Sequence, residues 1–149
     1  MRQKSRVKSV LAIALGLMFL ASLSAAYAGT YTTPQRGSPE RKAIMNALRI
    51  PVQKVLGQKV VFVVDILNVG EGWAFLFGRP QQPSGKKIDY RNTPYAEDVK
   101  IGMFDDSISA LLRNKGSGWR VVTYDIGATD VVWETWAEDY GAPGELFAH

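Results

Sequence analysis

Two runs of strand-forming residues, separated by a glycine turn, constrain the fold of this chain most strongly. The run Val60–Val69 (VVFVVDILNV) is apolar and mostly β-branched, which is typical of a strand covered on both faces. Gly70–Gly72 (GEG) predicts a tight turn, and Trp73–Phe77 (WAFLF) predicts the returning strand. In that strand, Trp73, Phe75 and Phe77 share one face. An antiparallel hairpin of this kind needs further layers to bury its surfaces.

A second hairpin follows later in the chain. Residues Met103–Arg113 contain the next strand, most securely over Ile108–Arg113. Residues 114–118 (NKGSG) have turn chemistry, and Trp119–Ile126 (WRVVTYDI) is rich in β-formers that pair back. The sequence therefore predicts four antiparallel strands.

The chain ahead of the strands predicts a helix. Ser38 is a good N-cap, Pro39 suits the first helical position, and Glu40 favours the positive end of the helix. Apolar residues recur at helical spacing, at Ala43, Ile44, Ala47, Leu48, Val52, Val55 and Leu56. Pro51 lies inside this stripe, so we expect a kink or a restart there, and Gly57 ends the helix.

The chain after the strands predicts a second helix, capped by Thr129 or Asp130 and closed by Gly141 and Pro143. One face of this helix holds Val132, Trp133, Trp136, Ala137 and Tyr140. We expect Trp133 and Trp136 to be core residues. Residues 142–149 predict a loosely held tail in which Leu146 and Phe147 touch the body.

Between the two hairpins, Gly78–Asp98 has three prolines and no pattern of either helix or strand. Twenty residues without a pattern are unusual inside a compact domain, and such loops are often functional. The alternative is that the stretch contains a short strand, such as Lys87–Tyr90.

The first 28 residues predict a secretory signal peptide. Four basic residues precede an apolar run over Val10–Leu20, and Ala26–Ala28 fits the small-x-small cleavage pattern. The alternative is an uncleaved leader that tethers the protein to a membrane. Cleavage would leave a polar N-terminus over 29–37, predicted to be disordered, and a single domain over 38–141.

The leader also explains the basic charge. It holds four of the 18 basic residues and none of the 14 acidic ones, so the remaining chain has 14 of each. Residues 29–91 then carry 10 basic and four acidic residues, and residues 92–149 carry the reverse. Either the two halves pair as solvated surface charge, or they form a bipolar surface that steers a charged partner. A neutral domain lacks the excess of cations that nucleic-acid binding requires.

Helix, hairpin, long loop, hairpin and helix together define an α+β fold. A kinked N-terminal helix packs on a four-stranded antiparallel sheet, with an additional C-terminal helix. Through the N-terminal helix and the FVVDILNVGEGWAFLF and LLRNKGSGWRVV hairpins, residues 38–126 resemble the cystatin-like and nuclear-transport-factor-like (NTF2-like) group. Through SPERKAIMNALR, GWAF and TDVVWETWAEDYG, the chain also resembles a family of small exported proteins of Gram-negative bacteria, a resemblance that implies no activity.

The chain lacks the residues that most catalytic mechanisms need. The chain has no cysteine, and its one histidine is the terminal His149. The acidic pairs Glu97-Asp98 and Asp105-Asp106 do not have the spacing of a calcium loop, and residues 83–87 (PSGKK) do not complete a phosphate loop. We therefore expect no enzyme activity, no metal and no cofactor.

Asp65 is the one titratable residue that keeps an enzyme hypothesis open, because it interrupts an apolar strand in register with Val61, Val63, Leu67 and Val69. A surrounding apolar cavity would favour its protonated form and suit it to act as a general base. The NTF2-like resemblance implies such a cavity. The alternative is that Asp65 pairs with a cation on a neighbouring strand.

These observations favour an exported, periplasmic or secreted, non-enzymatic domain that binds a protein or a cell-envelope component. The second hypothesis is a small-molecule enzyme or ligand carrier with a cavity around Asp65, and the third is a membrane-tethered envelope subunit. The predicted binding surface combines exposed aromatic residues with cations: Trp73, Lys86, Lys87, Tyr90, Arg91, Tyr95 and Trp119.

Overall fold

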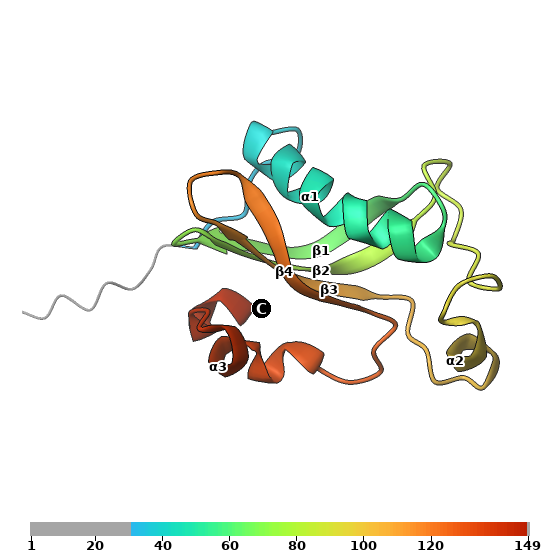
Figure 1. Cartoon of the computed structure of the whole chain (residues 1–149). Coiled ribbons are helices and arrows are strands. Elements are labelled where there is room, and N and C mark those ends of the chain that lie inside the picture. Colours follow the sequence, from blue (N-terminus) through green and yellow to red (C-terminus); the bar gives the residue numbers. More distant parts are fainter. Residues whose placement is uncertain (1–30, 149) are drawn as a thin grey trace, which may run out of the picture.

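The computed structural model describes residues 31–148 and has an α+β architecture (Figure 1). One long helix lies on one side of a four-stranded antiparallel sheet, and the C-terminal segment lies on the other. The elements are, in order, α1 (Pro39–Leu56), β1 (Val61–Gly70), β2 (Trp73–Gln81), α2 (Ala96–Lys100), β3 (Ile108–Asn114), β4 (Trp119–Ile126), η1 (Val132–Thr135), α3 (Trp136–Tyr140) and η2 (Gly144–Phe147). The predicted leader, residues 1–28, lies outside the described residues.

Helix α1 begins and ends where the sequence predicts. The Ser38 hydroxyl accepts a hydrogen bond from the Arg41 backbone N–H, and Gly57 adopts a left-handed conformation (φ 64°) that closes the last turn. Helical structure continues through Pro51 to Leu56, so the helix does not restart at the proline. Pro51 has no N–H to donate to the carbonyl one turn earlier, yet burial of the flanking Leu48 and Val52 holds the turn in place.

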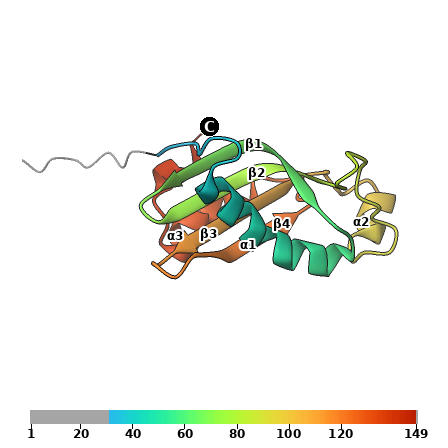
Figure 2. The same ribbon diagram turned by 90° about the horizontal axis from the view of Figure 1, so that it is seen from above.

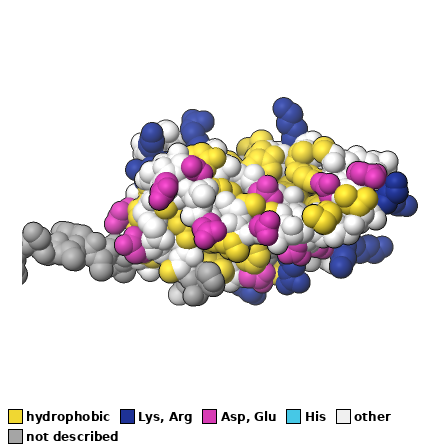
Figure 3. Space-filling model, turned by 90° about the horizontal axis from the view of Figure 1, so that it is seen from below, with side chains coloured by type: hydrophobic (Ala, Val, Ile, Leu, Met, Phe, Trp, Pro, Cys, Tyr) yellow, Lys and Arg dark blue, Asp and Glu magenta, His cyan; other side chains and the backbone are white. Residues whose placement is uncertain are grey.

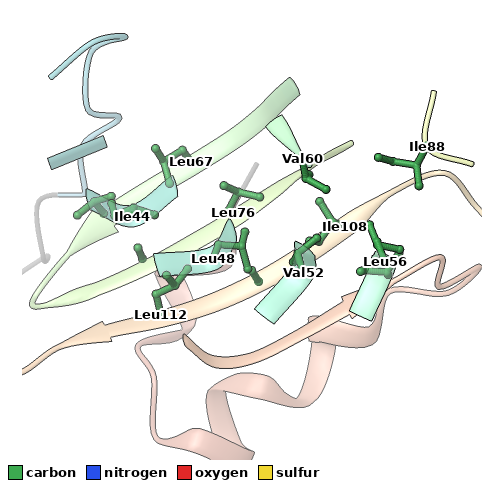
Figure 4. Packing of buried hydrophobic residues seen from close by; sticks show 14 of the residues in the cluster. Ile44, Leu48, Val52, Leu56, Val60, Leu67, Leu76, Ile88, Ile108 and Leu112 are labelled. Carbon is green, nitrogen blue, oxygen red and sulfur yellow. The ribbon is translucent and has the colours of Figure 1, made fainter. Parts of the chain in front are cut away.

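The sheet is a simple meander with the strand order β1-β2-β3-β4. Figure 2 shows α1 crossing over the sheet. Between helix and sheet lies the larger core, to which α1 contributes Ile44, Leu48, Val52 and Leu56 at intervals of four residues (Figure 4). Its sheet side includes Leu67, Leu76, Ile108 and Leu112.

A β-bulge at Asp65 corrects the predicted facing of β1. The register pairs Val64 with Gly78 and Ile66 with Phe77, which leaves Asp65 without a partner residue. Phe62 and Val64 therefore face α1 before the bulge, and Leu67 and Val69 face α1 after it. Val61 and Val63 do not share a face with Leu67 and Val69, because the extra residue inverts the alternation.

The second core lies on the opposite face of the sheet. Phe75 and Leu111 meet Trp136, Ala142 and Leu146, all of them buried. The predicted C-terminal helix is in fact the 3₁₀ helix η1 followed by the short helix α3, and Gly141 ends α3 as predicted (φ 66°). Trp136 is a core residue, as predicted.

Trp133 belongs to the same layer of aromatic rings. It is half-buried, and its ring centroid lies 5.5 Å from that of Phe75 and 5.1 Å from that of Phe77. The aromatic face predicted for β2 is therefore the floor on which the C-terminal segment packs.

Both predicted loose ends are attached to the sheet. Thr32 exchanges two backbone hydrogen bonds with Val69 on the free edge of β1, at 2.9 and 2.8 Å, which attach the N-terminal segment to the sheet at that residue. Leu146 is fully buried, and the Asn68 side-chain amide donates to the carbonyls of Leu146 and Ala148. The segment after Gly141 is thus part of the folded body and not a loose tail.

The stretch between the hairpins has more structure than its composition indicates. Strand β2 continues to Gln81, with Pro80 inside it, and α2 follows at Ala96–Lys100. In place of the suggested strand over 87–90 there is a single bridge between Gln81 and Lys87.

The ion pairs contradict the idea that the two oppositely charged halves pair with each other. The described residues contain three ion pairs, which are Arg79–Asp65, Arg91–Asp89 and Lys100–Glu97. Each of them lies within one half. The charges are instead separated across the sheet, because α1 carries Arg41, Lys42, Arg49 and Lys54, whereas residues 129–148 carry five acidic side chains and no basic one.

We predict that Gly78→Ala destabilises the protein by about 1–3 kcal/mol, the usual cost of an overpacked site. A Cβ at Gly78 would lie 2.2 Å from the Val63 carbonyl oxygen, which is backbone and cannot turn aside. The measurement is the free energy of unfolding in urea. Gly144→Ala is the matched control for lost flexibility, because nothing lies within 4 Å of its Cβ position and Gly144, like Gly78, does not adopt a left-handed conformation. Equal stability of Gly78→Ala and wild type would show that β1 does not approach β2 this closely.

Candidate functional site

The seven predicted binding residues do not form one surface. Trp73 lies at the first residue of β2, and the loop residues follow its last residue, Gln81. Nine strand residues span about 26 Å, so the two groups occupy opposite ends of the sheet (Figure 1). Trp119 is separated from Trp73 in another way, because it is half-buried against the α1 core while Trp73 packs on the opposite core.

At the α2 end, three aromatic rings form a cluster. The ring centroid of Tyr90 lies 4.5 Å from that of Phe104 and 6.4 Å from that of Tyr95. The Tyr90 hydroxyl donates to Asp106 Oδ1 at 2.7 Å, and burial, together with this hydrogen bond, raises the pKa of Tyr90 above its ordinary value. Tyr90 is thus mainly a core residue that holds the loop in place.

Polar contacts fasten this loop to the end of α1. The Gln58 side-chain amide donates to the Asp89 carbonyl at 2.7 Å and accepts from the Asp89 N–H at 3.1 Å. The Thr93 hydroxyl donates to the Tyr90 carbonyl at 2.8 Å and accepts from the Tyr95 N–H, which shapes the turn into α2. The backbone around residues 88–95 is therefore preorganised.

Between this loop and α2 lies an open cleft of about 560 Å³, hereafter the α2 cleft. The atoms that it exposes are mostly apolar, although half of its lining residues are charged: Ile88, Asp89, Tyr90, Arg91, Ala96, Glu97, Val99 and Lys100. Its charged residues are paired with each other, Arg91 with Asp89 and Lys100 with Glu97. The hydrogen bonds from Arg91 lower the pKa of Asp89 to about 2, so this carboxylate is ionised at neutral pH.

Exposed apolar side chains lie on α2 and in the loop that follows it, and one of them, Val99, lines the α2 cleft. Val99, Ile101 and Met103 are 43%, 59% and 61% exposed, although they are large and apolar. Figure 3 shows hydrophobic side chains reaching the surface at the end of the molecule that carries α2. Sequence reasoning missed these three residues, because an apolar residue in a patternless stretch does not reveal whether it is buried.

Lys86 and Lys87 are exposed and lie outside the α2 cleft. The Lys86 carbonyl accepts a hydrogen bond from the Gln82 N–H, and this bond closes the turn between the two residues. Lys87 lines a separate hollow of about 250 Å³ with Arg79 and Asp106. Of the predicted surface, the structure brings Tyr90 and Arg91 together at the α2 cleft, with Tyr95 beside them in the aromatic cluster.

Trp73 lines a different groove, of about 390 Å³, in which its neighbours are Arg113, Lys115, Arg120 and Tyr140. These three cations are not among the residues predicted from the sequence to bind a partner. The strand register could have found them, because alignment of the two predicted hairpins places Arg113 opposite both Trp73 and Arg120.

Asp65 lies at the surface and not in a cavity. Its side chain is 46% exposed, and its carboxylate lies 3.8 Å from Arg79 Nε on the neighbouring strand. This is the pairing with a cation on a neighbouring strand that was the alternative to a general base. The bulge is what turns Asp65 away from the buried positions of β1.

The one histidine, His149, lies outside the described residues. Within residues 31–148, no three His, Cys, Asp or Glu side chains come together as a metal site would require. Over the same range, no helix has the length and hydropathy needed to cross a membrane.

Comparison of the chain with protein-family models, with curated proteins and with solved structures gives no match. The resemblance to the cystatin-like and NTF2-like group stays a prediction.

Near the α2 end, the burial of Asp125 lowers the stability of the folded state by an amount that depends on pH. Burial raises its pKa above the ordinary 3.8, and a hydrogen bond from the Ala128 backbone opposes the rise only in part. The folded state therefore holds the Asp125 proton more tightly than the unfolded state, so Asp125 lowers stability as the pH rises through the raised pKa.

We predict that Asp125→Asn is more stable than wild type at pH 7, because the amide oxygen can still accept from Ala128 without burying a charge. The gain should disappear as the pH falls below about 4, where the wild-type carboxyl becomes neutral in both states. Urea unfolding at a series of pH values measures both stabilities. A gain that is the same at every pH would contradict this explanation.

Proposed function

We propose that the protein is an exported, periplasmic, non-enzymatic domain that binds a protein or cell-envelope component, and that the α2 cleft receives an apolar segment of a partner protein. The observation that carries this proposal is the cleft of about 560 Å³, lined in part by the exposed Val99 and followed along the chain by the exposed Ile101 and Met103. Soluble domains rarely expose neighbouring apolar groups unless something covers them.

The charge arrangement supports an apolar occupant. Arg91 and Lys100 are neutralised by Asp89 and Glu97, so the rim offers no unpaired cation to an acidic ligand. Ile88 and Tyr90 form an apolar floor that the contacts of Gln58 and Thr93 hold rigid. A rigid floor lowers the entropy that binding costs.

The hypothesis of an enzyme or carrier built around Asp65 has less support. A general base of that kind would need a cavity that excludes water, whereas the Asp65 carboxylate is about half exposed and faces Arg79. Asp65 lines none of the hollows described above.

To test the α2 cleft, a photo-reactive amino acid is placed at Ile101 and, as a control, at Ile50 on α1, which is exposed to 72%. In the cells that make the protein, we expect Ile101 to give a discrete cross-linked partner that Ile50 does not give. With that partner purified, Val99→Asp should weaken binding at least about tenfold, since it puts a charge on an apolar contact. Ile50→Asp should have no such effect.

The proposal for the cleft is overturned if Ile101 and Ile50 give the same cross-linked species, or if neither gives one. It is also overturned if Val99→Asp and Ile50→Asp bind the partner equally well. Circular dichroism of both variants distinguishes a lost contact from a lost fold.

The proposed export of the protein makes a separate prediction about its N-terminus. Mass spectrometry of the protein recovered from its cells should find an N-terminus at Gly29, the residue after the Ala26–Ala28 pattern. Every helix and strand that the structure describes lies after this point. A chain that retains Met1 and fractionates with membranes would instead support the tethered subunit.

A further inference from the structure

The groove beside Trp73 gathers positive charge at the end of the sheet opposite α2. It is lined by Trp73, Arg113, Lys115, Ser117, Gly118, Arg120, Val122 and Tyr140. Residues 92–149 contain only four basic residues, and three of them, Arg113, Lys115 and Arg120, lie here. The acidic half of the chain has thus concentrated its cations in one place.

The strand register forces two of these cations together. Arg113 on β3 lies opposite Trp73 on one side and opposite Arg120 on the other. Directly opposite residues share a face of the sheet, and like charges in such positions destabilise it. Nothing in the fold requires two arginines here, because Arg120 is exposed and packs in neither core.

The guanidinium group of Arg113 is held in position, but it has few hydrogen-bond acceptors. Nη1 donates to the Glu71 carbonyl at 2.8 Å, and the guanidinium carbon lies 4.4 Å from the centre of the Trp73 ring. Nε is buried and has no hydrogen-bond partner. A partly buried cation with so few acceptors is stabilised by a nearby anion.

No carboxylate of the described residues supplies that anion. The three ion pairs within residues 31–148 involve none of Arg113, Lys115 and Arg120. The acidic residues of the neighbouring C-terminal segment therefore do not come within 4.0 Å of these cations.

We propose that this groove binds an oxyanion, a phosphate or carboxylate group, carried by a small molecule. Two guanidinium groups and an ammonium group suit the several acceptor oxygens of such a group. Tyr140 and Val122, both exposed at the surface, provide an apolar wall for the rest of the molecule. The volume of about 390 Å³ is that of a small-molecule site. The groove lies at the other end of the sheet from the α2 cleft, so the proposal does not depend on the function proposed there.

Titration of the purified protein with phenyl phosphate, benzoate and phenol, followed by NMR, tests the proposal. Phenyl phosphate or benzoate should cause saturable shifts of the Trp73 indole N–H and of the Ser117 and Gly118 amides, and neutral phenol should not. Tighter binding of phenyl phosphate identifies a phosphate ligand, and tighter binding of benzoate identifies a carboxylate.

The decisive comparison uses two variants that each remove one exposed cation. Arg120→Gln should raise the Kd of the tighter-binding anion, phenyl phosphate or benzoate, at least about tenfold. Lys42→Gln, on the opposite side of the sheet, should leave that Kd within about twofold, because exposed charges so far from the groove are screened. Both positions are exposed, so both variants should keep the wild-type NMR spectrum elsewhere. The proposal is overturned if neither anion gives saturable shifts, or if the two variants weaken binding equally.

Discussion

The burial of β2 and β3 on both faces is the constraint on which the rest of this structure depends. Ala74, Phe75 and Leu76 are fully buried, as are Ala110 and Leu111, so the middle of each strand has no face available to water. Without disulfides, the two apolar layers that cover these strands must supply the stability. Helix α1 provides one layer, and the residues after Ala128 provide the other. The C-terminal segment is therefore as necessary to the fold as the long helix.

Two covered faces leave only the ends and edges of the sheet for binding. At one end, the chain between the hairpins folds over Tyr90 and Phe104 and exposes the apolar side chains of α2 and its C-terminal loop. At the other end, the turns of both hairpins meet, and Trp73 lies beside Arg113. The first surface is apolar with its charges paired, and the second is cationic with its charges unpaired. They suit different ligands and share no lining residue.

Much of this fold is predictable from the sequence because strong local signals agree with each other. Ser38, Pro39 and Gly57 fix the ends of α1, and the GEG and NKGSG turns fix both hairpins. The strand alternation is predictable only as far as Asp65. The bulge there depends on how β1 meets Gly78 on its partner, and this close approach is a tertiary feature that no periodicity within β1 records. The packing of residues 31–37 and 142–148 also depends on distant partners, which are Val69 and Asn68.

The candidate sites were harder to predict because they depend on which residues of separate elements become neighbours. Aromatic content pointed to Tyr90 and Trp119, but both pack against the core, and the exposed apolar residues are aliphatic or Met. Trp73 was the more informative residue, because its neighbours follow from the pairing of two predicted hairpins. That pairing sets Arg113 against Arg120, where sheet stability alone favours opposite charges or apolar pairs. Residue pairs that lower the stability of a fold are expected mainly at functional sites, where binding and not stability is selected. This conflict makes the groove at Trp73, and not the larger α2 cleft, the place where the sequence itself indicates the chemistry of a ligand.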